Sequence, residues 1–217
     1  MKPTLPQIPD RSARPGFFVS FEGGEGVGKS TQIQILKNKL IELGKSVVTT
    51  REPGGTKAAE AIRAILLGNE YHQLTDRAEA LLFAAARADV VANVIDPALA
   101  DGNVVLADRY LDSSVAYQGY ARKLGSEEVK VLSLWATRGL LPDLTIVLDL
   151  DPIIGMNRVS SPDRLESLEL NFHRLVRNAF RELAQNEPNR FLLVDASLDT
   201  NEISNIVFDE VQSRLAL

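Results

Sequence analysis

The sequence contains no cysteine, and this absence excludes structural disulfides, thiolate metal sites and catalysis by a thiol. Histidine is almost as scarce: the chain has His72 and His173, and neither is paired with a carboxylate or a second histidine at the spacing of a metal site. We therefore expect both to be structural or surface residues. No apolar run approaches the roughly 20 residues that a membrane helix needs, so we expect no membrane partner.

An excess of positive charge is also missing. The 217 residues carry a net charge of -5, which argues against nucleic acid or an anionic membrane surface as the principal partner. Any basic site must then be local. With 45% apolar residues, the chain has ample material for the core of one α/β domain. Together with the lack of cysteine, this composition leads us to expect a cytoplasmic protein.

The first fifteen residues differ in composition from the rest. They contain four prolines and three basic residues, and they lack the apolar middle of a signal peptide. We interpret residues 1–15 as a flexible tail and residues 16–217 as a single domain.

The most informative segment is 17–31, FFVSFEGGEGVGKST. An apolar β-prone run leads into the pattern G-x-x-x-x-G-K-S, and a helix-compatible segment follows, which is the context that a phosphate-binding loop needs. Glycines let backbone N–H groups face the phosphates, and the start of the helix adds its free amides and positive dipole end. Lys29 offers a cation to the outer phosphates, and the Ser30 hydroxyl can ligate magnesium. The residues predicted to bind a nucleoside triphosphate are Gly23, Gly24, Glu25, Gly26, Val27, Gly28, Lys29, Ser30 and Thr31.

Strand-like and helical segments alternate along the chain. Short apolar runs rich in β-branched or aromatic residues predict strands over 17–21, 46–50, 104–107, 144–150 and 191–194. Helical patterns cover 30–43, 57–67, 76–100, 126–137, 152–159, 165–187 and 202–215. This order predicts an α/β fold of the P-loop NTPase type, with a doubly wound five-stranded parallel sheet, helices on both faces and a short lid. Ligands bind beyond the carboxyl ends of such strands.

Polar residues follow these strands where the fold predicts a site. Asp108 and Arg109 come directly after the third strand; the carboxylate can hold magnesium and the guanidinium can grip a phosphate through two bonds. The alternative is an internal ion pair between these two residues. Arg51 opens a turn-rich segment after the second strand, and Arg63 on the next helix is either a ligand-facing or a solvated charge.

Several other residues have the chemistry of an acceptor site. Phe83 and Arg87 lie four residues apart, hence on one helix face, where they could stack on and hydrogen-bond a flat heterocycle; the alternative is a buried Phe beside a surface Arg. Glu25 is an acid within an anion-binding loop, so we favour a role at the acceptor over a solvent-facing position. The segment 117–119, Tyr-Gln-Gly, would be a turn on its own evidence.

Two more features allow opposite interpretations. Arg158 and Arg164 flank a polar break between helices, which is either a lid over about 158–164 that carries cations to the transferred phosphoryl group or an ordinary exposed loop. Trp135 and its apolar neighbours belong either to the core or to a subunit interface.

From Phe17 onward the chain resembles the bacterial thymidylate kinases. The resemblance rests on FEGGEGVGKST at 21–31, TREPGGT at 50–56, LLFAAAR at 81–87, DRYLDSSVAYQGYAR at 108–122, LPDLTIVLDL at 141–150 and DRLE at 163–166. It implies transfer of the γ-phosphoryl group from ATP to dTMP, with Mg²⁺, by a protein that is usually a homodimer. The interface would then involve the helix over 76–100 and the segment around Trp135.

The resemblance also implies a role for individual residues. Arg63 and Arg109 would bind the dTMP phosphate, and Asp108 would lie beside the magnesium. Phe83 would stack on thymine while Arg87 bonds its O4, and Ser114 and Gln118 would read or support the base. Tyr117 would crowd the ribose 2′ position, Glu25 would approach the 3′-hydroxyl, and Arg51 would lie near the acceptor pocket. Lys29, Arg109, Arg158 and Arg164 would be the catalytic cations.

One departure from the family concerns the lid. Relatives without an arginine in the phosphate loop usually have an arginine-rich lid, whereas this lid is a few residues shorter and keeps Arg158 and Arg164 alone. Two other functions remain open: another deoxynucleotide or deoxynucleoside kinase, and a nucleotide switch without transfer activity. Against the switch, the sequence lacks the guanine-reading Asn-Lys-x-Asp motif.

Overall fold

A computed structural model describes residues 14–215 of the chain. The expected tail falls largely outside the described residues. Of that tail, Arg14 is described, and its guanidinium pairs with Asp143 at 3.2 Å. No helix within residues 14–215 is long and apolar enough to cross a membrane.

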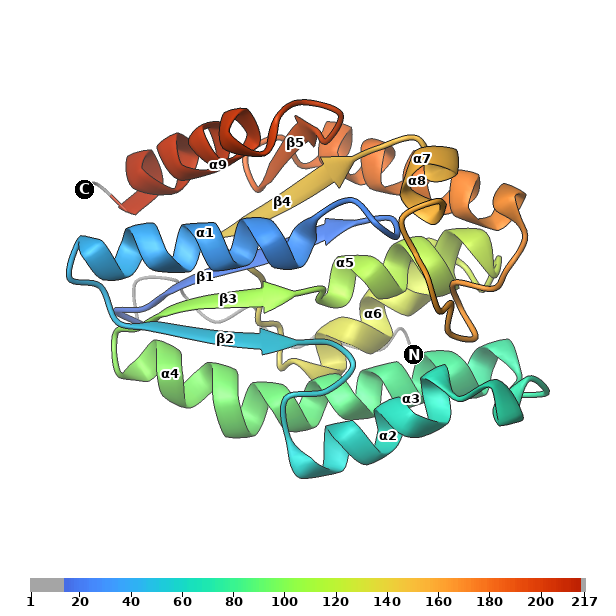
Figure 1. Cartoon of the computed structure of the whole chain (residues 1–217). Coiled ribbons are helices and arrows are strands. Elements are labelled where there is room, and N and C mark those ends of the chain that lie inside the picture. Colours follow the sequence, from blue (N-terminus) through green and yellow to red (C-terminus); the bar gives the residue numbers. More distant parts are fainter. Residues whose placement is uncertain (1–13, 216–217) are drawn as a thin grey trace.

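The centre of the molecule is a five-stranded, fully parallel sheet (Figure 1). The strands lie in the order β2-β3-β1-β4-β5. Their bounds are β1 Phe17–Gly23, β2 Val47–Arg51, β3 Val104–Asp108, β4 Leu144–Asp149 and β5 Phe191–Asp195. All five predicted strands and the fold class are confirmed.

Helices cover both faces of the sheet. Their bounds are α1 Lys29–Glu42, α2 Lys57–Leu67, α3 Asp76–Val90, α4 Asp96–Ala100, α5 Leu111–Ser114, α6 Ser126–Ala136, α7 Pro152–Met156, α8 Leu170–Asn186 and α9 Thr200–Leu215, with a 3₁₀ turn η2 at Asn69–Tyr71 and π-helical stretches η3 at Val91–Ile95 and η4 at Val115–Ala121. The alternation of β1 side chains explains the two layers, because successive side chains point to opposite faces. Phe17, Val19 and Phe21 pack with α1 and α9, and Phe18 packs with α3, α4, η4 and α8.

One helical segment was not predicted. Residues 111–121 form α5 and η4, although Tyr-Gln-Gly at 117–119 suggested a turn. Gly119 is needed for close packing here, because a Cβ at this position would lie 2.9 Å from the Cα of Ser126. The turn interpretation was wrong because tertiary packing, and not local flexibility, requires this glycine.

Two predicted helices have a boundary that is wrong by three residues or more, and a third contains a π-helical stretch. The helix expected over 165–187 begins at Leu170, because Asp163 accepts bonds from the backbone N–H groups of Leu165 and Glu166 and forms a separate turn. The helix expected over 152–159 ends at Met156. The segment 76–100 is helical throughout but has a π-helical stretch before Pro97, which lacks the N–H that an α-helical ladder requires.

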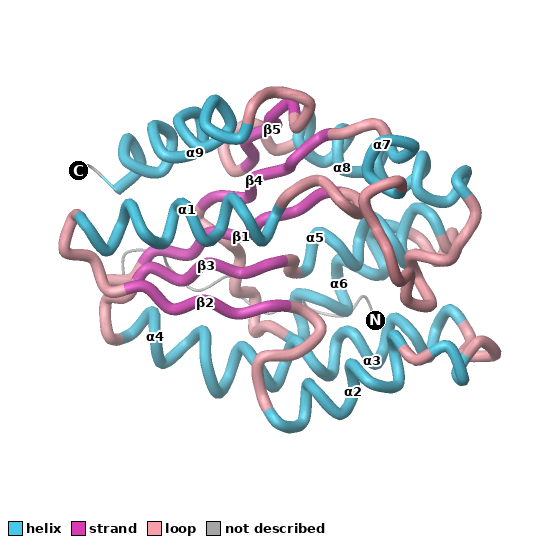
Figure 2. Tube along the Cα trace, viewed as in Figure 1, coloured by secondary structure: helices cyan, strands magenta, loops and turns pink. Residues whose placement is uncertain are grey.

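The loops that follow β1 and β2, and the loop between α7 and α8, lie at the same edge of the molecule (Figure 2). This is the edge toward which the strand arrows of Figure 1 point. The fold therefore brings the phosphate loop, the segments after β2 and β3, and the expected lid together.

Candidate active site

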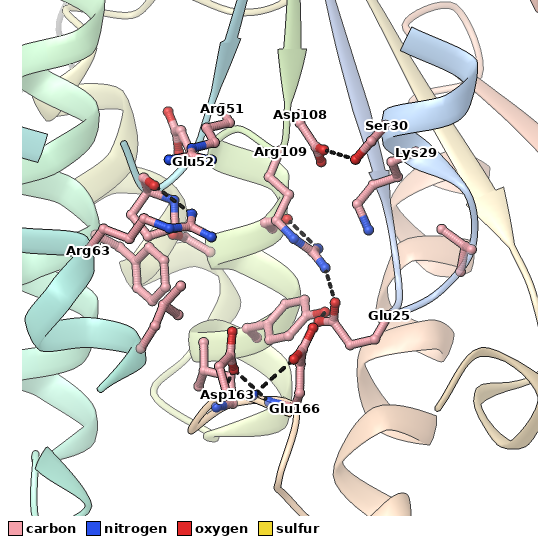
Figure 3. Close-up of a pocket in the computed structure, with 18 of the residues that line it drawn as sticks. Glu25, Lys29, Ser30, Arg51, Glu52, Arg63, Asp108, Arg109, Asp163 and Glu166 are labelled. Atoms are coloured by element: carbon pink, nitrogen blue, oxygen red, sulfur yellow. Dashed lines mark hydrogen bonds and ion pairs between the residues drawn. The ribbon is translucent and has the colours of Figure 1, made fainter. Parts of the chain in front are cut away.

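A cavity of about 460 Å³ lies among these loops. Its walls come from the loop after β1, the start of α1, the segments after β2 and β3, helices α2 and α3, η4 and the lid (Figure 3). The predicted residues that line it are Glu25, Gly26, Val27, Gly28, Lys29, Ser30, Thr31, Arg51, Arg63, Phe83, Arg87, Asp108, Arg109, Ser114, Tyr117 and Gln118. Gly23 and Gly24 lie at its edge, where their carbonyls accept bonds from lining cations.

The phosphate loop has the geometry of an anion site. Gly28 precedes α1 in the left-handed region, with φ of 93°, and no side chain caps the helix. The first N–H groups of α1 are therefore free for a ligand. Gly26 faces the backbone of α7, where a Cβ would lie 2.1 Å from the Gly155 carbonyl oxygen. A larger residue at 26 would push these two segments apart.

Lys29 is the buried cation of this loop. Its ammonium donates to the Gly24 carbonyl at 2.7 Å, and Figure 3 shows it directed into the cavity. Burial lowers the pKa of Lys29 to about 8, with the neighbouring Arg109 acting in the same direction and Glu25 and Asp108 opposing. An anionic ligand would raise this pKa again, because a nearby negative charge favours the ammonium form.

Ser30 and Asp108 meet at the mouth of the loop. The Ser30 hydroxyl donates to Asp108 Oδ2 at 3.0 Å (Figure 3). A hydroxyl and a carboxylate are hard oxygen donors of the kind that Mg²⁺ prefers, so the pair fits the predicted metal site. Within residues 14–215 no cluster of three or more His, Cys, Asp or Glu side chains could hold a metal, so phosphate oxygens and water would complete the shell.

Arg109 occupies the middle of the cavity. It has a positive φ of 70°, and its guanidinium donates to the Gly23 carbonyl and to Glu25 Oε2, each at 2.8 Å (Figure 3). The internal pair of Asp108 with Arg109 is not formed: Arg109 pairs with Glu25 instead.

Glu25 is not solvent-facing. Its second oxygen accepts from the Tyr117 hydroxyl at 2.6 Å. Burial opposes ionisation of Glu25, but Arg109, Lys29 and the Tyr117 hydroxyl outweigh burial and lower its pKa to about 2. Glu25 is thus an anion at neutral pH that orients Arg109 and Tyr117.

Arg87 is a buried cation, and the alternative that placed it on the surface is wrong. It is 1% exposed, and its guanidinium donates to Glu52, Ser133, the Tyr110 carbonyl and Ser114. Of its five N–H bonds, one on Nη1 has no acceptor among residues 14–215. Because Arg87 and half-buried Phe83 line the same cavity, they offer one donor and one aromatic ring to a ligand.

Arg51 on β2 and Arg63 on α2 lie on the wall of the cavity opposite Lys29 and the phosphate loop (Figure 3). Arg63 donates to the Pro53 carbonyl at 2.7 Å, and burial together with Arg51 lowers the pKa of its guanidinium. Arg51 is largely exposed and pairs with Glu60 at 3.1 Å. Both side chains line the cavity, as Lys29, Arg87 and Arg109 do, so five cationic side chains surround the space for an anionic ligand.

The lid places its two arginines differently. Arg158 is exposed and donates to the Gly26 carbonyl at 3.1 Å. Arg164 does not line the cavity: it is 8% exposed, and it donates to the Leu66 carbonyl and to Glu79, each at 2.7 Å. Of the two predicted catalytic arginines, the structure therefore brings Arg158 to the phosphate loop, whereas Arg164, together with Arg122, neutralises the buried Glu79 carboxylate.

Several lining or supporting residues were not predicted. Lid residues Asp163, Leu165 and Glu166 line the cavity beside Arg164, and Ser113 lines it next to Arg109. The signal for the lid residues was the pattern Asp-x-x-Glu at 163–166, typical of a capped turn, in which Glu166 also accepts from the Asp163 N–H.

Glu22 and Glu52 were also missed. Glu22 supports the site from behind: it accepts from the Tyr110 N–H and the Ser113 hydroxyl, and burial with nearby Asp112 raises its pKa to about 8. Glu52 lines the cavity beside Arg87, and burial raises its pKa against the effect of Arg87. The available signal for Glu22 was an acid at the end of an otherwise apolar strand.

The histidines agree with their predicted roles. His72 is exposed, and His173 is buried on α8, where burial lowers its pKa. Trp135 is 72% exposed, so its interpretation as a core residue is wrong.

Known proteins resemble this chain over most of its length. The family model for thymidylate kinase matches residues 21–207. Thymidylate kinase of Leifsonia xyli is 55% identical over 88% of this chain and 92% of its own, and that of Bifidobacterium longum subsp. infantis is 50% identical over 92% and 88%. The crystal structure of thymidylate kinase from Ehrlichia chaffeensis matches with a TM-score of 0.77 at 29% identity, over 91% of this chain and 99% of that one. The chain belongs to the thymidylate kinase family.

Proposed function

We propose that this protein transfers the γ-phosphoryl group of ATP to dTMP, giving dTDP and ADP. One observation carries the proposal: a single cavity holds a phosphate loop and, beside it, a second compartment with cations and an aromatic ring. The family membership supports it, since relatives about half identical to this chain are named thymidylate kinases.

On the donor side, the N–H groups of residues 23–31 and the Lys29 ammonium would bind the ATP phosphates. Ser30 and Asp108 are the residues that would hold Mg²⁺, which supplies charge neutralisation on the phosphates when bound. The acceptor is already a phosphate anion, so no general base is needed. The task of the protein is to hold two anions in line and offset their repulsion.

On the acceptor side, Arg63 and Arg109 would bind the dTMP phosphate, with Arg51 near it. Phe83 would stack on thymine, and the remaining Nη1 hydrogen of Arg87 would bond O4. Ser114 already accepts from Arg87, so it would support the base site indirectly. The Tyr117–Glu25 pair would face the sugar, with Tyr117 against the 2′ position and Glu25 toward the 3′-hydroxyl.

Of the two lid arginines, we assign transition-state contact to Arg158. Its exposed side chain has one hydrogen bond to lose, at the Gly26 carbonyl of the phosphate loop. Arg164 would have to leave a buried carboxylate, which costs several kcal/mol.

The competing functions make different demands on the same cavity. A nucleoside kinase needs a carboxylate base free to take a hydroxyl proton, but Glu25 has its pKa lowered to about 2 and is already paired with Arg109. A nucleotide switch needs no acceptor compartment at all. Release of ADP, measured by a coupled assay with dTMP, dUMP, dCMP and thymidine, distinguishes the three. Turnover with dTMP above all others is expected; turnover with thymidine alone, or none, would contradict the proposal.

We further propose that the protein is a cytoplasmic homodimer. Leu81 on α3 is 57% exposed and Trp135 on α6 is 72% exposed, and these two helices pack against each other. A second copy of the same face would cover these large apolar side chains. Light scattering should give twice the mass of the 23.8 kDa chain, and Trp135→Glu should give the monomer. A monomeric unmodified protein would contradict this.

A further inference from the structure

Glu79 on α3 is a completely buried carboxylate that no step of the proposed reaction uses. Its two oxygens accept from three side chains. Gln118 donates at 3.0 Å, Arg122 at 3.3 and 3.1 Å, and Arg164 at 2.7 Å. The four residues come from α3, η4, the segment after it and the lid, so Glu79 joins elements that are far apart in the chain.

The chemistry of this cluster decides how the Gln118 amide is oriented. A carboxylate flanked by two guanidinium groups only accepts hydrogen bonds. Gln118 must therefore present its NH₂ group to Glu79, and its carbonyl oxygen points away from that carboxylate. Within residues 14–215 nothing donates to this oxygen, and Gln118 lines the cavity. The Gln118 carbonyl oxygen can therefore accept a hydrogen bond from a ligand in the cavity.

A donor lines the same cavity. Ser114, which accepts from Arg87 Nη2 at 2.9 Å, is four residues from Gln118 in the same helical segment, so the two share a face. Because Arg87 and Gln118 both line the cavity, the free N–H of Arg87 and the free carbonyl of Gln118 can offer a donor and an acceptor to one ligand. Thymine and uracil present the complementary edge, the O4 carbonyl beside N3–H. Cytosine presents the reverse, an amino group beside an unprotonated N3.

We propose that Glu79 is a positioning residue that holds the Gln118 amide in the orientation that selects a 4-oxo pyrimidine over a 4-amino pyrimidine. The proposal rests on the proposed function, because it concerns the acceptor base of that reaction. Without an acceptor-only partner, the Gln118 amide could turn over and offer its NH₂ group to cytosine N3. Glu79 selects the base without contacting it.

The test is Glu79→Gln, which keeps the shape but offers a partner that can also donate. We measure kcat/KM for dTMP, dUMP and dCMP at saturating ATP. The ratio of dTMP to dCMP should fall at least about tenfold. The ratio of dTMP to dUMP should stay unchanged, since both bases have the same O4 and N3–H. Glu182→Gln, at an exposed carboxylate bonded to Tyr120, is the matched control and should change neither ratio.

An equal loss of activity on all three substrates would overturn the proposal, because a purely structural role predicts that result. If Glu79→Gln does not fold, a crystal structure of the unmodified protein with dTMP tests whether Gln118 links Glu79 to the base. Gln118 should then bridge Glu79 and thymine N3, directly or through one water; a Gln118 that contacts only one of them refutes the proposal. Failure of the proposed function would be recognised separately, as an unmodified protein that releases no ADP with dTMP.

Discussion

The phosphate loop and the acceptor compartment share one cavity but are built in different ways. The loop is nine consecutive residues, 23–31, whose N–H groups and glycine conformations make the anion site. The acceptor compartment is made of side chains from separate elements, and several of them have a buried or half-buried carboxylate partner: Glu52 for Arg87, Glu79 for Gln118, Glu25 for Arg109. The anion site is therefore made by the backbone of one segment, whereas the acceptor compartment depends on carboxylates from other segments that hold its side chains in place.

The largest effect should come from the one side chain on which the loop depends. Lys29→Ala should lower kcat about 1,000-fold or more, because no other cation replaces its charge on the transferred phosphoryl group. The midpoint of thermal unfolding should not fall, since an ammonium that burial destabilises is removed. Lys39→Ala, at a half-buried lysine of α1 that bonds Asn205 outside the cavity, is the control and should retain full turnover. Normal turnover of Lys29→Ala would contradict the assignment of residues 23–31 as the phosphate-binding loop.

Removal of a carboxylate that supports a site residue should test the acceptor compartment. Glu52→Ala leaves Arg87 buried and unpaired, and should lower the free energy of unfolding by about 3–5 kcal/mol. The exposed pair of Arg51 with Glu60 provides the contrast, and Glu60→Ala should cost at most about 1 kcal/mol. Urea denaturation measures both. If both variants lost the same free energy of unfolding, the buried pair of Arg87 with Glu52 would contribute no more to stability than the exposed pair.

The lid arginines should separate catalysis from stability. Arg158→Ala should lower kcat about 100-fold and leave thermal stability unchanged, because its side chain is exposed. Arg164→Ala should lower the unfolding temperature, because it leaves Glu79 with one guanidinium partner fewer. If Arg164→Ala instead lowered kcat without affecting stability, the lid would have to rearrange before transfer.

The smallest effect expected is a dependence of ATP binding on pH. Lys29 has a pKa of about 8 in the free protein, so above that pH it must take up a proton to meet a triphosphate. The Kd of ATP should therefore be nearly constant from pH 6.8 to 7.5 and rise about tenfold by pH 9. Calorimetry measures this change.

Two variants show which residue causes the pH dependence of the ATP Kd. Lys29→Met should bind weakly with a flat profile over the same range. Glu22 also has a pKa raised to about 8 and lies near Arg109, so Glu22→Gln is needed as a control and should keep the rise. If the rise of the ATP Kd disappeared in Glu22→Gln, titration of the Glu22 carboxylate, and not of Lys29, would be its cause.

Much of this architecture could be predicted from the sequence. The five strands and the phosphate loop follow from contiguous patterns. The closeness of Ser30 and Asp108 follows from the rule that ligands bind at the carboxyl ends of parallel strands, although their direct hydrogen bond was not predicted. The helical segment 111–121 could not be predicted, because its glycine serves packing. The roles of the gathered site residues remain predictions until the variants are measured.

The sequence by itself determined the fold, the anion site and the family, because each depends on local conformation or on short motifs. Only the tertiary structure decided which cation meets which carboxylate. Arg87 and Glu52 are 35 positions apart, and Arg164 and Glu79 are 85 apart. Nothing local marks such partners: a buried charge must be paired, but the chain path through space determines which opposite charge is within reach.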